Sequence, residues 1–195
     1  MKSRVAVPLL CLLIWMGVLA CTDGVVPTDA VDASFSAGGR SGFGFNGNAS
    51  GFPTGAVRLT GGGSYDPTTA SNVIPTETTV VVSSGGFDCD ETVAQGPLAG
   101  CQAGEGVRWD TAQLLASAPF KCTGADAAKL ATTSSHTAVL LADFYRAGDG
   151  IDESFTAQMI VSDSDLAPEI PGIQTLWVQG VGCGVANAHF NGRIE

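Results

Sequence analysis

Alternation of apolar and polar positions predicts β structure in the second half of the chain. In FTAQMIVS (155–162) every second residue from Phe155 is apolar, a period of two that is typical of a strand with one buried face. The preceding segment, 137–146, is apolar on both faces, as expected of a central strand. Asp149-Gly150 lies between the two and supplies a turn signal. The sequence therefore predicts a β-hairpin here.

Five shorter runs are further strand candidates, separated by glycine pairs and triplets; they are 56–60, 78–83, 120–123, 175–183 and 188–193. Helical signals are few. Asp110 with Gln113 forms a capping-box pattern for a short helix ending at Ser117, and 125–131 could form another turn or two. The pattern predicts a mainly β protein: an antiparallel β-sandwich or jelly-roll-like single domain with one or two short helices.

The N-terminus has a different pattern from the rest of the chain. Lys2 and Arg4 precede a stretch without charge, 5–20, that is rich in leucine and ends in small residues. This order is typical of a signal peptide. Sixteen uncharged residues interrupted by Pro8 are fewer than the ~20 that a membrane span needs. Residues 1–20 are therefore expected to be a signal peptide.

The end of this segment reads Val18-Leu19-Ala20-Cys21 and resembles the lipobox of bacterial lipoproteins. The resemblance implies cleavage before Cys21, a diacylglycerol on its sulfur and acylation of the new amine. Two or three acyl chains anchor a protein to a bilayer far better than one. On this interpretation 21–33 is a lipidated tether and 34–195 the β-rich extracytoplasmic domain. The alternative is ordinary secretion with an unmodified Cys21.

The cysteine count agrees with export and lipidation. Of six cysteines, one leaves with the signal peptide and Cys21 would carry lipid, which leaves Cys89, Cys101, Cys122 and Cys183. An even number in an oxidising compartment predicts two disulfides, and no close C-x2-4-C pair suggests zinc. Three connectivities are open. We favour Cys89–Cys101, which closes a loop with glycine and proline, and Cys122–Cys183, which joins distant strands.

Net charge excludes some partners. Without Lys2 and Arg4 the mature chain has 7 basic and 19 acidic residues, a net charge of −12. Nucleic acid and anionic lipid headgroups are therefore poor partners. The acidic residues are scattered along the chain, as expected of a solvated surface.

Catalytic signatures are weak. His136 and His189 are the two histidines, and they do not have metal-ligand spacing. A Ser-His-Asp triad could be assembled from the residues present, but no G-x-S-x-G elbow marks a nucleophile. A carboxylate pair such as Asp110 with Glu105 could serve glycoside hydrolysis, yet any acidic protein contains such pairs. We assign no catalytic residue and no cofactor.

An acidic turn is a weak calcium candidate. Asp149, Asp152 and Glu153 could supply some of the oxygen ligands that calcium needs, and Asp163 and Asp165 are weaker candidates still. The order of residues does not match an EF-hand loop. A solvated β-turn that uses Asp-Gly for its backbone angles is the favoured interpretation.

Several aromatic residues could form a binding surface, as the rings of carbohydrate-binding modules do on a sandwich face. They are Phe43, Phe45, Phe52, Trp109 and Trp177. Large rings in a small β domain more often form its core, and that interpretation is favoured here, most clearly for 175–178.

Five segments resemble a small domain that recurs in exported bacterial proteins and is similar to modules found near cell-surface sorting signals: 57–66, 104–115, 120–124, 142–150 and 170–184. The resemblance implies an exported, β-rich domain and no activity. We therefore expect a lipid-anchored protein of the cell envelope with a non-catalytic domain that serves as a surface, envelope or interaction module. Its partners would be the membrane, through Cys21, and an envelope glycan or protein. The alternative is an envelope enzyme acting on glycan or peptide.

Overall fold

Eleven β-strands and one short 3-10 helix, η1 (Pro67–Thr69), form the regular structure of residues 39–73, 79–145 and 154–194, which are the residues that the computed structural model describes. The strands are β1 (Arg40–Gly51), β2 (Ala56–Tyr65), β3 (Val81–Glu91), β4 (Arg108–Leu114), β5 (Ser117–Phe120), β6 (Lys129–Thr132), β7 (Thr137–Tyr145), β8 (Ser154–Ser162), β9 (Leu176–Val178), β10 (Gly182–Gly184) and β11 (Ala186–Ile194).

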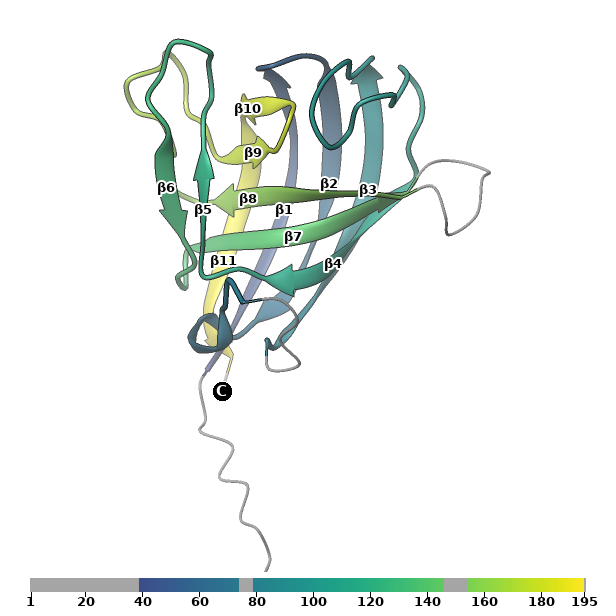
Figure 1. Cartoon of the computed structure of the whole chain (residues 1–195). Helices are drawn as coiled ribbons and strands as arrows, with labels where there is room; N and C mark the ends of the chain where they lie inside the picture. Colours follow the sequence, from purple (N-terminus) through teal and green to yellow (C-terminus); the bar gives the residue numbers. More distant parts are fainter. Residues whose placement is uncertain (1–38, 74–78, 146–153, 195) are drawn as a thin grey trace, which may run out of the picture. The chain divides into compact units, whose positions relative to one another are not determined.

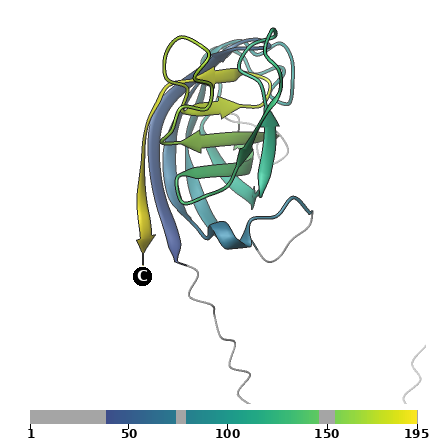
Figure 2. The same ribbon diagram turned by 90° about the vertical axis from the view of Figure 1, so that its left-hand side faces the viewer.

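Nine of these strands form one antiparallel sheet in the order β10-β9-β8-β7-β4-β3-β2-β1-β11. Because β10 also pairs with β1, the sheet closes on itself. Figure 1 shows β11, β1, β2 and β3 as one layer, with β4, β7, β8 and β9 running across it, and Figure 2 shows the two layers from the side. Two layers that cross in this way form an orthogonally packed β-sandwich. The expected mainly β, antiparallel sandwich is confirmed.

The domain has a main core between the two layers and a second buried cluster, and strand β7 contributes side chains to both. Ala138, Leu140 and Phe144 face the main core, whereas Val139 belongs to a second cluster. The second cluster lies under the two-stranded β5–β6 sheet, which covers the outer face of β7, β8 and β9 (Figure 2). A strand buried on both faces must be apolar at consecutive positions, which explains the apolar run AVLLA at 138–142.

The two strands of the predicted hairpin are confirmed. β7 and β8 pair from Thr137 with Ser162 to Tyr145 with Ser154, while the Asp149-Gly150 turn lies outside the described residues. Pairing at this register places alternate residues of β8 in the main core, as the period of two predicts.

Both predicted helices are wrong. Asp110 lies in β4, where it pairs with Ser84 of β3 and Asp143 of β7, and 117–120 is strand β5. Residues 129–131 lie in β6. In β4 the buried side chains of Trp109 and Leu114 and two flanking ladders outweigh the local capping signal at Asp110.

Strand boundaries also differ from the predicted ones. β3 starts at Val81 rather than residue 78 and continues to Glu91, and the strand expected at 120–123 is β5, which ends at Phe120. β1 was not predicted, because glycine occupies Gly42, Gly44 and other positions of its sequence and masks the alternation.

Two disulfides reinforce the domain. Cys89 at the end of β3 is bonded to Cys101, with Cα atoms 6.3 Å apart, and Cys122 is bonded to Cys183 of β10, with Cα atoms 4.8 Å apart. This is the pairing favoured from the sequence. Two disulfides fit a protein that folds in an oxidising, extracytoplasmic compartment. Within the described residues, no helix has the length and apolar character needed to cross a bilayer.

Candidate binding site

The seam between β1 and β10, where the sheet closes, frames a groove on the domain. Ser50 pairs with Cys183 and Gly51 with Gly182. Gly182 has φ +113°, a conformation that favours glycine, and a Cβ on Gly184 would lie 1.8 Å from the Asn48 carbonyl oxygen. The glycines of the GVGCG run therefore allow β10 to approach β1 closely enough to pair.

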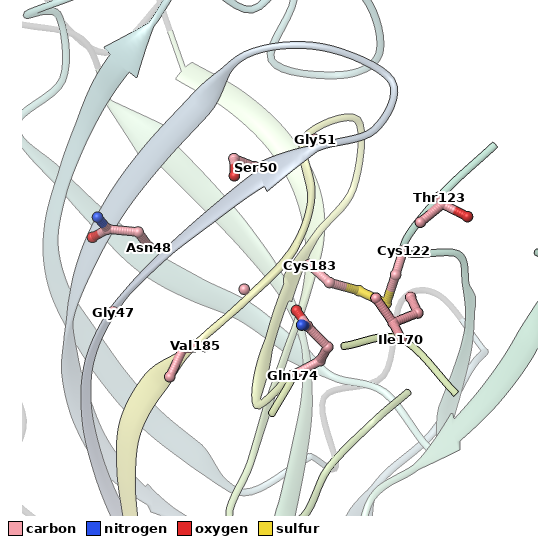
Figure 3. A pocket seen from close by; sticks show the side chains of 11 residues that line it. Gly47, Asn48, Ser50, Gly51, Cys122, Thr123, Ile170, Gln174, Cys183 and Val185 are labelled. Atoms are coloured by element: carbon pink, nitrogen blue, oxygen red, sulfur yellow. A yellow bond between two sulfur atoms is a disulfide. The ribbon is translucent and has the colours of Figure 1, made fainter. Parts of the chain in front are cut away.

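A groove of about 680 Å³ lies beside this seam. Figure 3 shows its walls: β1 from Gly47 to Gly51 on one side, the Cys122–Cys183 disulfide with Thr123 on the other, and the 170–174 loop below. The volume is within the usual range of small-molecule sites, ≈ 300–1,000 Å³. The groove is open to solvent along its length, so a ligand could extend beyond it.

Neutral polar side chains supply the chemistry of this groove. Asn48, Ser50, Thr123 and Gln174 line it together with Ile170, Val185, glycines and the disulfide, and none of the lining residues is ionisable. Within the described part of the chain, these four side chains make no hydrogen bond to another protein atom, and those of Asn48 and Ser50 are exposed to solvent. Amides and hydroxyls both donate and accept hydrogen bonds, so the groove can bind groups of either kind.

A second pocket, of about 350 Å³, is lined by residues next in sequence to those of the groove and is mainly apolar. Its walls are aromatic rings, prolines, two glutamines and one lysine: Phe52, Pro53, Pro119, Phe120, Lys121, Gln158, Trp177 and Gln179. Phe52 is half-buried, whereas Phe120 and Trp177 are buried. The Lys121 ammonium is 5.7 Å from the centroid of the Phe52 ring, within reach of a cation–π interaction.

Three links hold the segments that line the groove and the aromatic pocket to one another. The indole Nε1 of Trp177 donates to the Lys121 carbonyl at 3.0 Å, and the Phe52 amide donates to the Val181 carbonyl at 2.9 Å. The Cys122–Cys183 disulfide is the third. These links fix the lining residues before a ligand arrives, which lowers the entropic cost of binding.

The aromatic residues singled out from the sequence are mostly core, as favoured. Phe43, Phe45 and Trp109 lie between the two layers, and Trp177 lies in the cluster under the β5–β6 sheet. Phe52 is the exception, because it belongs to neither buried cluster and contributes a wall of the aromatic pocket.

The acidic candidates have structural partners. Glu105 accepts the Gln102 amide at 2.8 Å, and Asp110 is 3.7 Å from Arg108. Asp165 accepts two backbone amides at 3.0 Å and so shapes the loop that ends at Gln174. No cluster of three metal-ligating side chains occurs within 39–73, 79–145 and 154–194. Asp149, Asp152 and Glu153 lie outside the described residues, as does Cys21.

A histidine–aspartate pair, two of the three members of a Ser-His-Asp triad, lies on the surface. His136 Nδ1 is 2.6 Å from Asp163 Oδ2. His136 directly precedes β7 and Asp163 directly follows β8, at the end where Thr137 pairs with Ser162. The neighbouring Ser162 hydroxyl contacts the His136 carbonyl and the Thr137 hydroxyl rather than the imidazole. In the described part of the chain no serine hydroxyl is hydrogen-bonded to this ring. His189, the other histidine, is exposed on β11 against Gly44.

A buried phenol lies close to that pair. Tyr65 is fully buried and its hydroxyl donates to the Ser134 carbonyl at 2.6 Å. Burial raises the pKa of Tyr65 well above its usual value, and the negative charge of Asp163 raises it further. Tyr65 is therefore a permanent hydrogen-bond donor at neutral pH.

Sequence reasoning missed Asn48, Ser50, Thr123 and Gln174 as site residues. Each is a common surface residue with no local signature, and the four come together because β1 and β10 pair across more than a hundred positions of sequence. Comparisons with known protein families, with curated protein sequences and with solved structures find no match to this chain.

Proposed function

We propose that the protein is an exported, lipid-anchored component of the bacterial cell envelope, whose β domain binds a ligand and does not catalyse a reaction. The anchor is proposed on the Val18-Leu19-Ala20-Cys21 pattern, which follows a charged and then apolar N-terminal segment. The two disulfides support export, since such bonds persist in oxidising compartments.

The composition of the groove is the observation that carries the binding role. The groove has amide and hydroxyl walls and no ionisable residue, and the aromatic pocket adds only one ionisable residue, Lys121. Glycoside hydrolysis uses two carboxylates, and acyl transfer uses a nucleophile beside a base. Neither set lines these two hollows, whereas a rigid neutral surface with unsatisfied hydrogen-bonding groups suits reversible binding.

A binding experiment with the organism's own envelope tests the proposal. The full chain carrying Cys21→Ser, which lacks its lipid, should still sediment saturably with isolated envelopes. Gln174→Ala should weaken this binding, because its amide lines the groove. Asn46→Ala is the matched control, since Asn46 is exposed on β1 two positions from Asn48 and does not line the groove.

The same mixtures distinguish the binding module from the enzyme alternative. New reducing ends or new amino groups released from the envelope, and lost in Gln174→Ala, would show catalysis at the groove and contradict the proposal. Envelope binding that is absent, or equal in Gln174→Ala and Asn46→Ala, would also contradict it.

A further inference from the structure

We infer that the groove and the aromatic pocket together bind a neutral glycan chain, the groove holding sugar hydroxyls and the pocket an apolar sugar face. This inference rests on the proposed binding function and names the ligand class. The two hollows are lined by residues adjacent in sequence, Gly51 and Cys122 in the groove and Phe52 and Lys121 in the pocket, so one extended ligand can contact both.

The groove matches the hydrogen-bonding pattern of a sugar. Each sugar hydroxyl both donates and accepts, and so do the Ser50 and Thr123 hydroxyls and the Asn48 and Gln174 amides. A groove built for an anion would instead offer arginine or lysine, and a groove for a cation would offer carboxylates. The lining residues here include neither.

The aromatic pocket supplies the apolar surface that such a ligand also needs. Phe52 is half-buried, and Pro53 and Pro119 extend its apolar wall. The C–H face of a sugar ring packs against such a wall, while polar groups at the edge fix its orientation. Gln179 is such a group: its Oε1 accepts the Gln158 amide N–H at 3.1 Å, which leaves its NH2 group to donate.

Net charge makes a neutral glycan a better ligand than an acidic one. The mature chain carries 7 basic and 19 acidic residues, so a polyanionic chain would be repelled at long range. Lys121 is the one charged residue that lines either hollow, and its Nζ already donates to the Gly124 carbonyl at 3.3 Å.

Affinity electrophoresis tests the inference with defined probes. The purified full chain in neutral detergent would be run through native gels that contain xylan, glucomannan or a β-1,3-glucan, and through gels that contain polygalacturonate. We expect retardation by at least one neutral polysaccharide and none by polygalacturonate. Gln174→Ala and Phe52→Ala should each weaken the retardation by about 5–10-fold, the effect of removing one hydrogen bond or one packing surface.

Three controls keep the result interpretable. Asn46→Ala should be retarded like the wild type. Gln174→Glu keeps the size of the side chain but replaces its two donors with acceptors, and should also weaken binding. Phe52→Trp keeps an aromatic wall and should retain it. A thermal melt of each variant separates lost binding from lost folding.

The inference is overturned if no neutral polysaccharide retards the protein, if polygalacturonate alone does so, or if Gln174→Ala and Phe52→Ala bind like Asn46→Ala. Its failure is distinguishable from failure of the proposed function. Envelope binding that is lost in Gln174→Ala but is not competed by these polysaccharides would leave the binding module intact and reject the glycan.

Discussion

The indole Nε1 of Trp109 donates a hydrogen bond of 2.9 Å to the backbone carbonyl of Thr60. The β2–β3 ladder is interrupted at this point. Leu59 pairs with Phe87 and Gly62 with Ser84, but the two residues of β2 between them, Thr60 and Gly61, have no paired residue in β3. Trp109 also lies in the short β3–β4 pairing, where the sheet passes from one layer to the other. A tryptophan side chain thus completes the hydrogen bonding of the backbone at a corner of the sandwich.

Replacing Trp109 should destabilise the domain, less in Trp109→Phe than in Trp109→Ala. Trp109→Phe retains a ring but leaves the Thr60 carbonyl without its donor, and should lower the free energy of unfolding by about 1–3 kcal/mol. Trp109→Ala also opens a cavity in the core and should cost about 3–5 kcal/mol. Urea denaturation of both variants measures this, and a Trp109→Phe variant as stable as the wild type would show that the hydrogen bond contributes nothing.

Tyr65 should make stability fall at alkaline pH. Its folded-state pKa is raised above the unfolded value of about 10, so its contribution is fully present below pH 10 and is lost as the pH rises above it. Each pH unit between the two pKa values costs up to about 1.4 kcal/mol. Tyr65→Phe should be less stable at pH 7, because the Ser134 carbonyl loses its donor, but should lose less between pH 10 and pH 12. Parallel slopes of wild type and variant in this range would contradict the assignment.

The two disulfides should differ in what they contribute. The Cys122–Cys183 bond spans 61 positions and the Cys89–Cys101 bond 12. In the chain-entropy account these loops stabilise by about 4 and about 3 kcal/mol. Cys122→Ala/Cys183→Ala should therefore melt at a lower temperature than Cys89→Ala/Cys101→Ala and should also lose groove binding. Non-reducing peptide mapping should recover a Cys89–Cys101 peptide. Recovery of Cys89 linked to Cys122 or Cys183 would refute this connectivity. Four free thiols would refute both disulfides and reopen the question of the compartment.

Lipidation is tested at Cys21. Because acylation requires this cysteine, the Cys21→Ser variant should carry no lipid. Cells fed a clickable palmitate should label the wild-type chain and not the variant. Wild-type protein that stays unlabelled would reject the lipid anchor and leave ordinary secretion.

Calcium should not stabilise the protein. If Asp149, Asp152 and Glu153 are a solvated turn, millimolar calcium leaves the melting temperature unchanged. A binding site would instead stabilise by RT ln(1 + [L]/Kd). A rise in melting temperature that disappears in Asp152→Ala would establish the site.

The strands and the disulfides were more predictable than the binding site. Alternation over 155–162 reports burial of one face and so predicts β8, and the even cysteine count predicts two bonds. β1 could not be predicted in this way, since its glycines serve close strand approach rather than burial. Gln174 and Asn48 could not be assigned as site residues from the sequence. They line one groove only because the folded sheet brings distant segments together, and no local sequence pattern encodes this.

The pairing of β1 with β11 has a practical consequence for presenting the domain. Arg40 at the start of β1 pairs with Ile194 at the end of β11, so the first strand begins and the last strand ends at the same end of the domain, which Figure 1 marks with the C-terminus. The groove lies along the last third of the twelve-residue β1, from Gly47 to Gly51, roughly 23–36 Å from Arg40 along an extended strand. Attachment to a bead, a sensor chip or a fusion partner through either terminus should therefore leave the groove facing outward, free to meet a bulky polymer.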